Sequence, residues 1–252
     1  MKRLENKVAL ITGAGSGMGK AQAILFAEEG AKIIAADINK DGLNKTVEEI
    51  EKNGGSAFAV EIDVSDKSSV EEGVRKGLEK YGKIDILSNT AGILDDYKPT
   101  LDTPEKLWDK IMSVNLKGVY FMTNAVLPQM IEREEGTIVN IASIAAFVAG
   151  GGGAAYTSAK HAIAGYTKQL SFDYGKKGIR VNAIAPGAVE TGMTKEIFEE
   201  GSADVMEAVK SVPAGRYGQP EEIASVALFL ASEESSFMHG AIVPVDGGWI
   251  VK

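Results

Sequence analysis

The sequence of 252 residues contains no cysteine, and this absence excludes several kinds of chemistry. Disulfide bonds, thiolate metal ligands and a cysteine nucleophile cannot occur in this chain. Only two histidines are present, His161 and His239, and they lie too far apart to show the spacing of a histidine metal site. We therefore expect a protein whose chemistry depends neither on thiols nor on a bound metal.

Positive charge is also scarce. The chain has 27 lysines and arginines against 35 acidic residues, which gives a formal net charge of -8. A protein that binds the phosphate backbone of nucleic acid needs a basic face, so nucleic acid is not an expected partner. The first apolar run, residues 8–11, is too short for a signal peptide or a membrane span, and we expect a cytoplasmic protein with no membrane partner.

Short runs rich in β-branched residues alternate with longer helical patterns along the whole chain. The expected strands are residues 7–12, 32–37, 56–63, 83–89, 136–143, 178–186 and 241–246. The expected helices are residues 18–29, 40–52, 67–80, 104–114, 118–133, 155–174 and 220–231. Most of the strands are continuously apolar, which is expected when helices cover both faces of a sheet. The pattern predicts a single-domain α/β fold over residues 1–252, a Rossmann-like doubly wound parallel sheet of about seven strands.

One long connection interrupts this alternation. Between residues 188 and 217, Gly192, Gly201, Pro213 and Gly215 break a helical pattern. Long connections of this kind often cover a site, and we expect residues 188–217 to form a substrate lid; an ordinary long connection is the alternative.

A glycine-rich segment, TGAGSGMG, follows the first expected strand. The spacing Gly-x-Gly-x-x-Gly does not fit it, because Met18 stands where the last glycine would be. Gly13, Gly17 and Gly19 fit the spacing Thr-Gly-x-x-x-Gly-x-Gly instead. Glycines let the backbone turn tightly and approach a pyrophosphate, and the helix that follows offers free N–H groups and the positive end of its dipole. The segment therefore predicts a dinucleotide-binding turn, in preference to a glycine-rich turn without a ligand.

Asp37 ends the second expected strand. A carboxylate at this place can accept hydrogen bonds from the adenosine ribose hydroxyls and would repel a 2′-phosphate. Ser16 and Ile38, which flank the expected ribose site, are not basic, although Lys40 lies close by. We therefore expect NAD as the cofactor in preference to NADP. The alternative is that Asp37 caps the next helix, a role for which Asn39 is better placed.

Tyr156 and Lys160 lie one helical turn apart, just after four consecutive glycines at residues 150–153. A free tyrosine has a pKa of about 10, which is too high for proton exchange at neutral pH. A lysine ammonium on the same helix face favours the phenolate and would lower this pKa, and a positive nicotinamide ring would lower it further. Tyr156 is thus a candidate general base for alcohol oxidation and general acid for carbonyl reduction. Because such a pair alone is more often a solvated helix face, the interpretation depends on its surroundings.

Three further positions support a catalytic role for this pair. Ser143 ends the fifth expected strand, at the edge where such sheets bind ligands, and its hydroxyl is a candidate to hold the substrate oxygen. Asn115 offers an amide to support a proton-carrying water behind Lys160. The segment SNTAG closes the fourth strand at the same edge, and its Gly92 permits close approach of a cofactor.

Together with the Pro186–Gly187 turn, these motifs resemble the short-chain dehydrogenase/reductase family in order, in spacing and over essentially the whole chain. The resemblance implies hydride transfer between a nicotinamide and an alcohol or carbonyl. The catalytic residues that it implies are Asn115, Ser143, Tyr156 and Lys160. The cofactor residues that it implies are Gly13, Ser16, Gly17, Met18, Gly19, Asp37, Ile38, Asp63, Val64, Asn89, Thr90, Ala91, Gly92, Tyr156, Lys160, Pro186, Gly187, Val189 and Thr191. Relatives usually pair the helices expected at 104–133 and 155–174 between subunits, so the resemblance also implies a homotetramer.

One residue departs from the family pattern. The family often has a second asparagine in the turn after the fourth strand, where this chain has Thr90. Threonine keeps a hydroxyl but lacks the amide, so the local hydrogen bonding is in question and the chemistry is not.

The expected substrate pocket is mostly apolar and lined in part by small residues. Its segments are residues 93–97, 144–153 and 188–210, the last with Met193, Ile197, Phe198 and Met206. The residues expected at the substrate are Ser143, Ala145, Gly153, Tyr156 and Met193. We expect an uncharged secondary alcohol or ketone, small or cyclic, around which the glycine run bends. The alternative is that these side chains form core and lid packing.

Two other functions compete with this one. A 3-oxoacyl-[acyl-carrier-protein] reductase would need a basic patch beside the entrance for its acidic carrier. Lys176 and Lys177 are candidate contacts, but residues 132–135 are mainly acidic and Asp37 disfavours NADPH. The third candidate is a module that senses NAD without turnover, and it would not need Ser143 or Tyr156.

Overall fold

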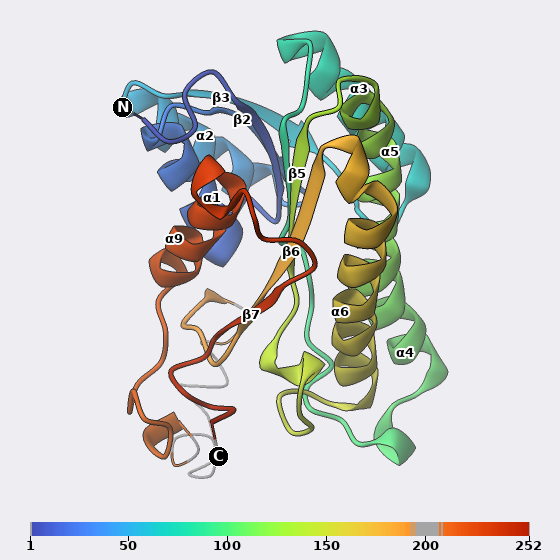
Figure 1. Ribbon diagram of the computed structural model, residues 1–252. Helices are drawn as coiled ribbons and strands as arrows, with labels where there is room; N and C mark the ends of the chain where they lie inside the picture. The colour runs from blue at the N-terminus through green and yellow to red at the C-terminus, as the bar shows by residue number, and fades with distance from the viewer. Residues whose placement is uncertain (1, 193, 195–206, 208, 252) are drawn as a thin grey trace.

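Seven parallel strands form one twisted sheet through the middle of the molecule (Figure 1). The computed structural model describes residues 2–192, 194, 207 and 209–251. The strand order is β3-β2-β1-β4-β5-β6-β7, and every neighbouring pair is parallel. The strands are β1 Val8–Thr12, β2 Lys32–Asp37, β3 Ser56–Glu61, β4 Ile86–Asn89, β5 Gly136–Ile141, β6 Ile179–Pro186 and β7 Ile242–Val245. The predicted doubly wound parallel sheet is therefore confirmed.

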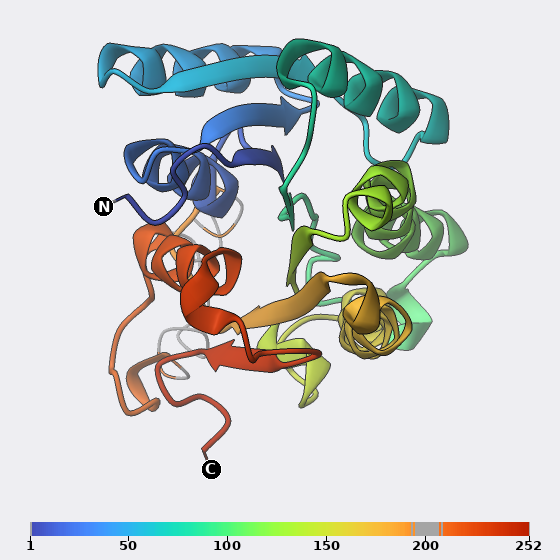
Figure 2. The ribbon, with the colours of Figure 1, turned by 45° about the horizontal axis from the view of Figure 1, so that its top comes forward.

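Helices cover both faces of this sheet (Figure 2). The longer helices are α1 Gly17–Glu28, α2 Lys40–Lys52, α3 Lys67–Tyr81, α4 Glu105–Met112, α5 Gly118–Glu132, α6 Ala154–Tyr174 and α9 Pro220–Ala231. α1, α2 and α9 lie on one face, and α3, α5 and α6 lie on the other. No helix in the described part of the chain has an apolar stretch long enough to cross a bilayer.

Two strands end two residues earlier than the sequence predicts. The expected strands 56–63 and 136–143 end at Glu61 and Ile141, so the last two residues of each lie outside the sheet. Asp63 and Ser143, which end the expected strands, instead line cavities at the carboxyl edge. The apolar pattern continues beyond the sheet because these residues stay partly or fully buried after the strand has ended.

The segment between residues 105 and 132 is one continuous helical path, where the sequence predicts two helices with a break. α4 passes into α5 through a π-helical turn, η2 Ser113–Lys117. Asn115 lies in this wider turn and is 1% exposed. Its Oδ1 accepts the N–H of Ile93 at 2.8 Å, and its Nδ2 donates to the carbonyl of Ile93 at 2.9 Å. Wide turns of this kind often occur at functional sites, and this one is fixed by contacts to the loop after β4.

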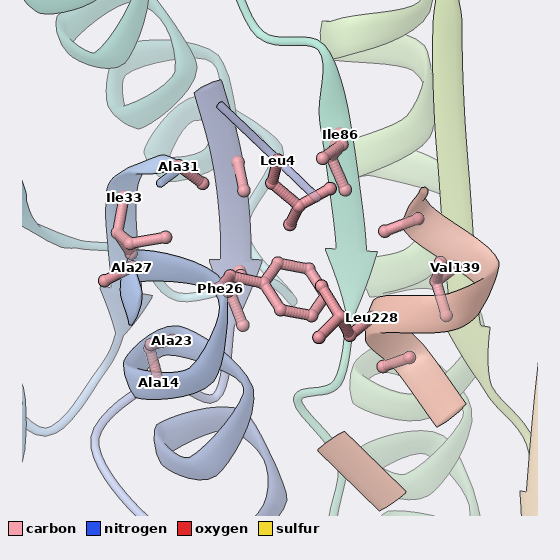
Figure 3. Packing of buried hydrophobic residues seen from close by; sticks show 14 of the residues in the cluster. Leu4, Ala14, Ala23, Phe26, Ala27, Ala31, Ile33, Ile86, Val139 and Leu228 are labelled. Carbon is pink, nitrogen blue, oxygen red and sulfur yellow. The ribbon is translucent and has the colours of Figure 1, made fainter. Parts of the chain in front are cut away.

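The core on the α1 face is built around Phe26. Its ring lies between the sheet and Leu228 of α9, and both side chains are fully buried (Figure 3). Ile33 and Ile86 contribute strand side chains to the same cluster. Because α1 begins at the turn after β1, this packing also holds that turn against the sheet.

We expect Phe26→Ala to lower the free energy of unfolding by about 3–5 kcal/mol, because it removes a fully buried ring and leaves a cavity. Denaturant unfolding at a fixed protein concentration measures the change. Phe237→Ala, at a side chain that is 99% exposed, serves as the matched control and should change the free energy by less than about 0.5 kcal/mol. Equal effects of the two substitutions would contradict this description of the core.

Candidate active site

The site lies at the carboxyl edge of the sheet, where the strand order changes direction between β1 and β4. β1 pairs with β2 on one side and with β4 on the other, so the connections that follow them diverge and leave a crevice. A cavity of about 470 Å³ occupies the crevice and adjoins a second cavity of about 290 Å³. Met18, Thr90, Gly92, Ile93 and Thr191 line both, so the two form one continuous site.

The turn after β1 forms one wall of the larger cavity. Gly13 and Gly17 have φ angles of 69° and 50°, in the left-handed region that favours glycine. A Cβ on Gly19 would lie 2.1 Å from the carbonyl oxygen of Gly13, so the turn can close only where this side chain is absent. α1 begins at Gly17, and the N–H groups of its first turn have no partner within the helix. The wall therefore suits an anionic group such as a pyrophosphate.

Asp37 lines the same cavity at the end of β2. Its Oδ2 accepts the N–H of Gly15 at 2.9 Å and its Oδ1 accepts the N–H of Asn39 at 2.8 Å. Asn39 is the residue that caps α2, since its Oδ1 accepts the N–H of Gly42 at 3.0 Å. The preference for Asn39 as the helix cap is thus confirmed. Each oxygen of Asp37 keeps a lone pair for a further donor. The carboxylate could therefore accept one hydrogen bond from each of two ribose hydroxyls.

The surroundings of Asp37 contain little positive charge. Ile38 lines the cavity with a side chain that is 65% exposed, and Lys40 does not line it. Lys110 of α4 is the one basic residue among the described lining residues. The sequence interpretation missed Lys110, because nothing in its helix pattern shows that α4 reaches the cavity.

The loop after β4 forms the opposite wall and is tied to β1. The hydroxyl of Thr12 accepts the N–H groups of Thr90 and Ala91 at 2.9 and 3.0 Å. A Cβ on Gly13 would lie 3.1 Å from the backbone nitrogen of Ala91, so the two walls are in close contact. Thr12 is 2% exposed, and its hydroxyl joins the end of β1 to the loop after β4 at the bottom of the site.

The amide missing at Thr90 is supplied from α1. The hydroxyl of Thr90 donates to Oε1 of Gln22 at 3.2 Å, and the hydroxyl of Ser88 donates to the same oxygen at 2.5 Å. Gln22 is completely buried. The Thr90 hydroxyl therefore has partners in Ser88 and Gln22, whereas Nε2 of the buried Gln22 has no partner among the described residues.

Asn89 does not line either cavity, so its expected place along the cofactor stays a prediction. Its Nδ2 donates to Oδ1 of Asn140 at 2.9 Å, and Nδ2 of Asn140 donates to the hydroxyl of Thr167 at 2.9 Å. Asn89 is 3% exposed and belongs to a polar network inside the molecule that links β4, β5 and α6. The other expected cofactor residues all line one or both cavities.

The smaller cavity brings Ser143, Tyr156 and Lys160 together. Ser143 precedes the short helix η3 Ile144–Ala146, and its hydroxyl accepts the N–H of Ala145 at 3.1 Å. Lys160 is 5% exposed, donates from Nζ to the carbonyl of Ile141 at 2.8 Å, and lies 5.4 Å from the centre of the Tyr156 ring. The expected trio thus shares one wall, with the lysine beneath the tyrosine.

The pKa values of this pair differ from the expectation. Burial raises the pKa of Tyr156 to about 12; a hydrogen bond with Ser143 lowers it, and the nearby Tyr97 and Asp95 raise it. Burial lowers the pKa of Lys160 to about 8. The expected lowering of the tyrosine pKa by the lysine is therefore wrong for the protein without its cofactor. Burial is the largest cause of both pKa shifts, and it disfavours the charged form of each residue.

Asn115 lies beside this trio and outside both cavities. A Cβ on Gly92 would lie 3.3 Å from Oδ1 of Asn115 and 3.8 Å from Nζ of Lys160, so the asparagine and the lysine meet behind this glycine. Both polar atoms of the amide bind the backbone of Ile93. The amide therefore holds the loop after β4, and its support of a water behind Lys160 stays a prediction.

Of the residues expected at the substrate, Ser143 and Tyr156 line the smaller cavity and two others do not. Ala145 is completely buried behind Ser143. Gly153 is also buried, and a Cβ there would lie 2.6 Å from Oδ2 of Asp95. In both cases the chain turns the residue toward the interior, and its expected contact with the substrate stays a prediction. Met193 lies outside the described residues, as do Ile197, Phe198, Met206 and residues 195–206 of the expected lid.

The glycine run contributes to the cavity only in its first half. Gly150 and Gly151 line the cavity, whereas a Cβ on Gly152 would lie 2.4 Å from the Tyr156 ring. Tyr97 and Trp249 also line it. Trp249 was missed by the sequence interpretation, because it lies beyond β7 and far along the chain from every motif.

Comparisons with known proteins agree with this geometry. The family model described as Enoyl-(Acyl carrier protein) reductase matches residues 13–250. The 3-oxoacyl-[acyl-carrier-protein] reductase FabG of Thermotoga maritima is 43% identical over 249 residues, which cover 99% of this chain and 100% of that protein. The cyclohexanol dehydrogenase of an Acinetobacter species is 38% identical over 250 residues, covering 99% and 97%. The solved structure of levodione reductase has a TM-score of 0.93 at 37% identity and covers 98% of both chains.

The parallel sheet, the glycine turn and the Ser–Tyr–Lys wall define an oxidoreductase that uses a nicotinamide dinucleotide, NAD or NADP. The chain belongs to the short-chain dehydrogenase/reductase family. The residues present fit such a cofactor. The glycine turn after β1 can close only because Gly19 has no Cβ, and the cavity beside this turn is continuous with the one that Tyr156 lines.

We expect Gly19→Ala to weaken NADH binding at least about tenfold, because the new Cβ would displace the turn that holds the pyrophosphate. Fluorescence titration with NADH measures the dissociation constant. Gly165→Ala is the matched control, since a Cβ at this position of α6 meets nothing within 4 Å. NADH binding that is equally tight in the two variants would show that the turn does not hold the cofactor.

Proposed function

We propose that this protein is an NAD(H)-dependent oxidoreductase that interconverts an uncharged secondary alcohol, small or cyclic, and its ketone. The observation that carries the proposal is the wall formed by Ser143, Tyr156 and Lys160 in a cavity continuous with the one that Asp37 lines. The adenosine part of the cofactor would lie at Asp37, Ile38, Asp63 and Val64, and the nicotinamide part at Pro186, Gly187, Val189 and Thr191.

The proposed mechanism assigns one role to each polar group of the wall. The Ser143 hydroxyl holds the substrate oxygen, and Tyr156 takes the hydroxyl proton in oxidation and returns it in reduction. The bound nicotinamide supplies the acceptor or donor of the hydride. Lys160, fixed by the carbonyl of Ile141, lies beneath the tyrosine and holds the ribose of the nicotinamide.

Because the pKa of Tyr156 is raised, we propose that the oxidised cofactor also helps Tyr156 to lose its proton. With a pKa of about 12 the residue is a neutral phenol at neutral pH, so it is ready to donate a proton in reduction. Oxidation requires the phenolate, which the positive charge of oxidised nicotinamide would favour. Alcohol oxidation should therefore increase with pH, and carbonyl reduction should decrease as the phenol loses its proton.

Asp37 supports NAD as the cofactor, although the class alone does not select it. A similar solved structure from Agrobacterium tumefaciens, with a TM-score of 0.88 and 38% identity, contains NADP. In this chain a carboxylate lines the expected ribose site, and Lys40 does not line the cavity. A 2′-phosphate would meet this carboxylate with no adjacent basic partner to offset the repulsion.

The apolar lining supports an uncharged cyclic substrate. Leu94, Ile144, Ala188, Val209 and Trp249 contribute apolar surface to the smaller cavity. The names of three relatives, cyclohexanol dehydrogenase, 3beta-hydroxysteroid dehydrogenase 2 and levodione reductase, refer to cyclic alcohols and ketones. The described residues Thr194 and Val209 of the expected lid line this cavity. We further propose that the protein assembles as a homotetramer.

A second candidate is the reduction of 3-oxoacyl chains on an acyl carrier protein. The identity to the Thermotoga maritima reductase favours it. Lys176 and Lys177, however, lie in η4 Gly175–Lys177, which follows the carboxyl end of α6. α6 has 21 residues, so these lysines are about 30 Å along the helix from Tyr156 and do not flank the cavity.

A panel of cyclic alcohols, with NAD and separately with NADP, tests the proposal through NADH or NADPH absorbance. Turnover of cyclic alcohols with NAD supports it. Activity confined to acetoacetyl-carrier protein and NADPH would favour the second candidate. NAD binding without turnover of any substrate would favour a module that senses NAD.

We expect Tyr156→Phe to reduce kcat at least about a hundredfold, because it removes the group that transfers the proton. NADH affinity should stay within about twofold, since the aromatic ring is kept. Tyr174→Phe, at the other end of the same helix, is the matched control and should keep wild-type kcat. Wild-type turnover by Tyr156→Phe would exclude the acid–base role.

Asp37→Ala should weaken NAD and improve the relative use of NADP at least about tenfold, because both the ribose acceptor and the repulsive charge are lost. The ratio of kcat/KM for the two cofactors measures this preference. Asp41→Ala removes the same charge from the exposed first turn of α2 and should leave the ratio unchanged. Equal use of NAD and NADP by the wild-type protein would contradict the assignment of Asp37.

A further inference from the structure

A completely buried carboxylate, Asp95, contacts the helix that carries Tyr156. It follows β4 in the loop over residues 92–98. Its Oδ1 accepts the N–H of Gly153 at 2.8 Å, and its Oδ2 accepts the N–H of Tyr156 at 2.8 Å. Bonds from N–H groups to an ionised carboxylate are stronger than neutral ones. Asp95 has no part in the function proposed above and does not line either cavity.

The two bonds act as the N-terminal cap of α6. Gly153 is the residue before the helix and has no side chain that could cap it. The carbonyl of Lys98 accepts the next N–H, that of Ala154, at 3.0 Å. Three N–H groups at the start of α6, those of Gly153, Ala154 and Tyr156, are therefore satisfied by a loop about 58 residues earlier in the chain.

This arrangement buries a charge at an energetic cost. A buried carboxylate is strongly destabilising unless it is paired or fully hydrogen-bonded. Asp95 takes part in none of the ion pairs found within the described ranges. The positive end of the α6 dipole and the two N–H bonds provide the compensation. The buried carboxylate therefore favours contact between the loop and the helix start.

The backbone on both sides of this contact is shaped to permit it. A Cβ on Gly153 would lie 2.6 Å from Oδ2 of Asp95 and 2.6 Å from the backbone nitrogen and oxygen of Lys98. Asp96 and Tyr97 have φ angles of 54° and 57°, which are unusual for residues other than glycine. Tyr97 lines the smaller cavity beside Tyr156. The carboxylate therefore binds the start of the helix that carries Tyr156, from a loop that also carries Tyr97.

We propose that Asp95 is a positioning residue for Tyr156, which it holds at the cavity wall by joining the loop over residues 95–98 to the first turn of α6. The proposal rests on the acid–base function proposed for Tyr156. A displacement of the reacting group by about 1 Å can reduce turnover about a hundredfold, so a contact that fixes the helix start affects kcat.

The charge of Asp95 also affects the pKa of Tyr156, which an uncharged helix cap would not do. The groups that face the Tyr156 phenol are Ser143, Tyr97 and Asp95, with Lys160 on its own helix. Among them Asp95 and Tyr97 raise the pKa of Tyr156. Removal of the charge at residue 95 therefore lowers this pKa, and the rise of alcohol oxidation with pH moves to lower pH.

Asp95→Asn tests the proposal with little change in shape. One carboxylate oxygen becomes an NH2 group that faces an N–H donor, so one of the two bonds is lost. We expect kcat for alcohol oxidation to fall at least about tenfold, NADH affinity to stay within about twofold, and the pH profile of kcat to shift toward lower pH. Asp96→Asn is the matched control, because it removes the same charge from the exposed next residue and asparagine tolerates its positive φ. It should keep the wild-type profile.

Amide hydrogen exchange of residues 153–157 gives a readout that does not depend on activity. Exchange should be faster in Asp95→Asn than in Asp96→Asn. Faster exchange without loss of kcat, or a kcat and pH profile equal to those of the control, would overturn the positioning role. If Asp95→Asn does not fold, Gly153→Ala opens the same contact from the helix side and must reduce kcat with little change in NADH affinity. A failure of the proposed function is seen separately, as wild-type turnover by Tyr156→Phe.

Discussion

The first turn of α6 is held at the carboxyl edge of the sheet, and the positions of Tyr156 and Lys160 depend on this contact. Lys160 anchors the helix to β5 by donating to the carbonyl of Ile141, two residues before Ser143. Asp95 anchors the start of the same helix to the loop after β4. Because the strands are all parallel, these anchors and the glycine turn after β1 meet at one edge although they are far apart in the chain.

The electrostatics of the site follow from burial at this edge. Removal from solvent raises the pKa of Tyr156 to about 12 and lowers that of Lys160 to about 8. Both shifts disfavour the charged forms, so the free protein rests with a neutral phenol. The positive charge of an oxidised nicotinamide can then stabilise the phenolate, and the buried wall makes this interaction stronger than it would be in water. The proton transfer proposed for Tyr156 would in this way be linked to the presence of the cofactor.

The parts of the site that the sequence predicts are those that local patterns determine. The strand and helix order, the glycine turn and the spacing of Tyr156 and Lys160 each depend on neighbouring residues, and the structure places them as expected. Asn39 as the cap of α2 is another such local feature. Properties that depend on solvent are different, because the periodicity that places Lys160 next to Tyr156 does not show that both are removed from water.

The parts that the sequence does not predict are contacts between distant residues. Gln22 supplies the acceptor for Thr90 across about 68 positions, and Asp95 caps a helix about 58 positions away. No spacing rule connects such pairs. The side chains of Asn89 and Ala145 turn inward for the same reason, because the network around Asn140 and the packing behind Ser143 are properties of the folded chain.

The most direct measurement of the central claim is the ionisation of Tyr156 itself, followed by carbon-13 NMR of tyrosine-labelled protein. The resonance that is lost in Tyr156→Phe identifies the residue. We expect it to remain the neutral phenol over the folded pH range in the free protein and to titrate at a lower pH once oxidised NAD is bound. A titration that is the same with and without NAD would contradict the link between the cofactor and the proton-transferring group.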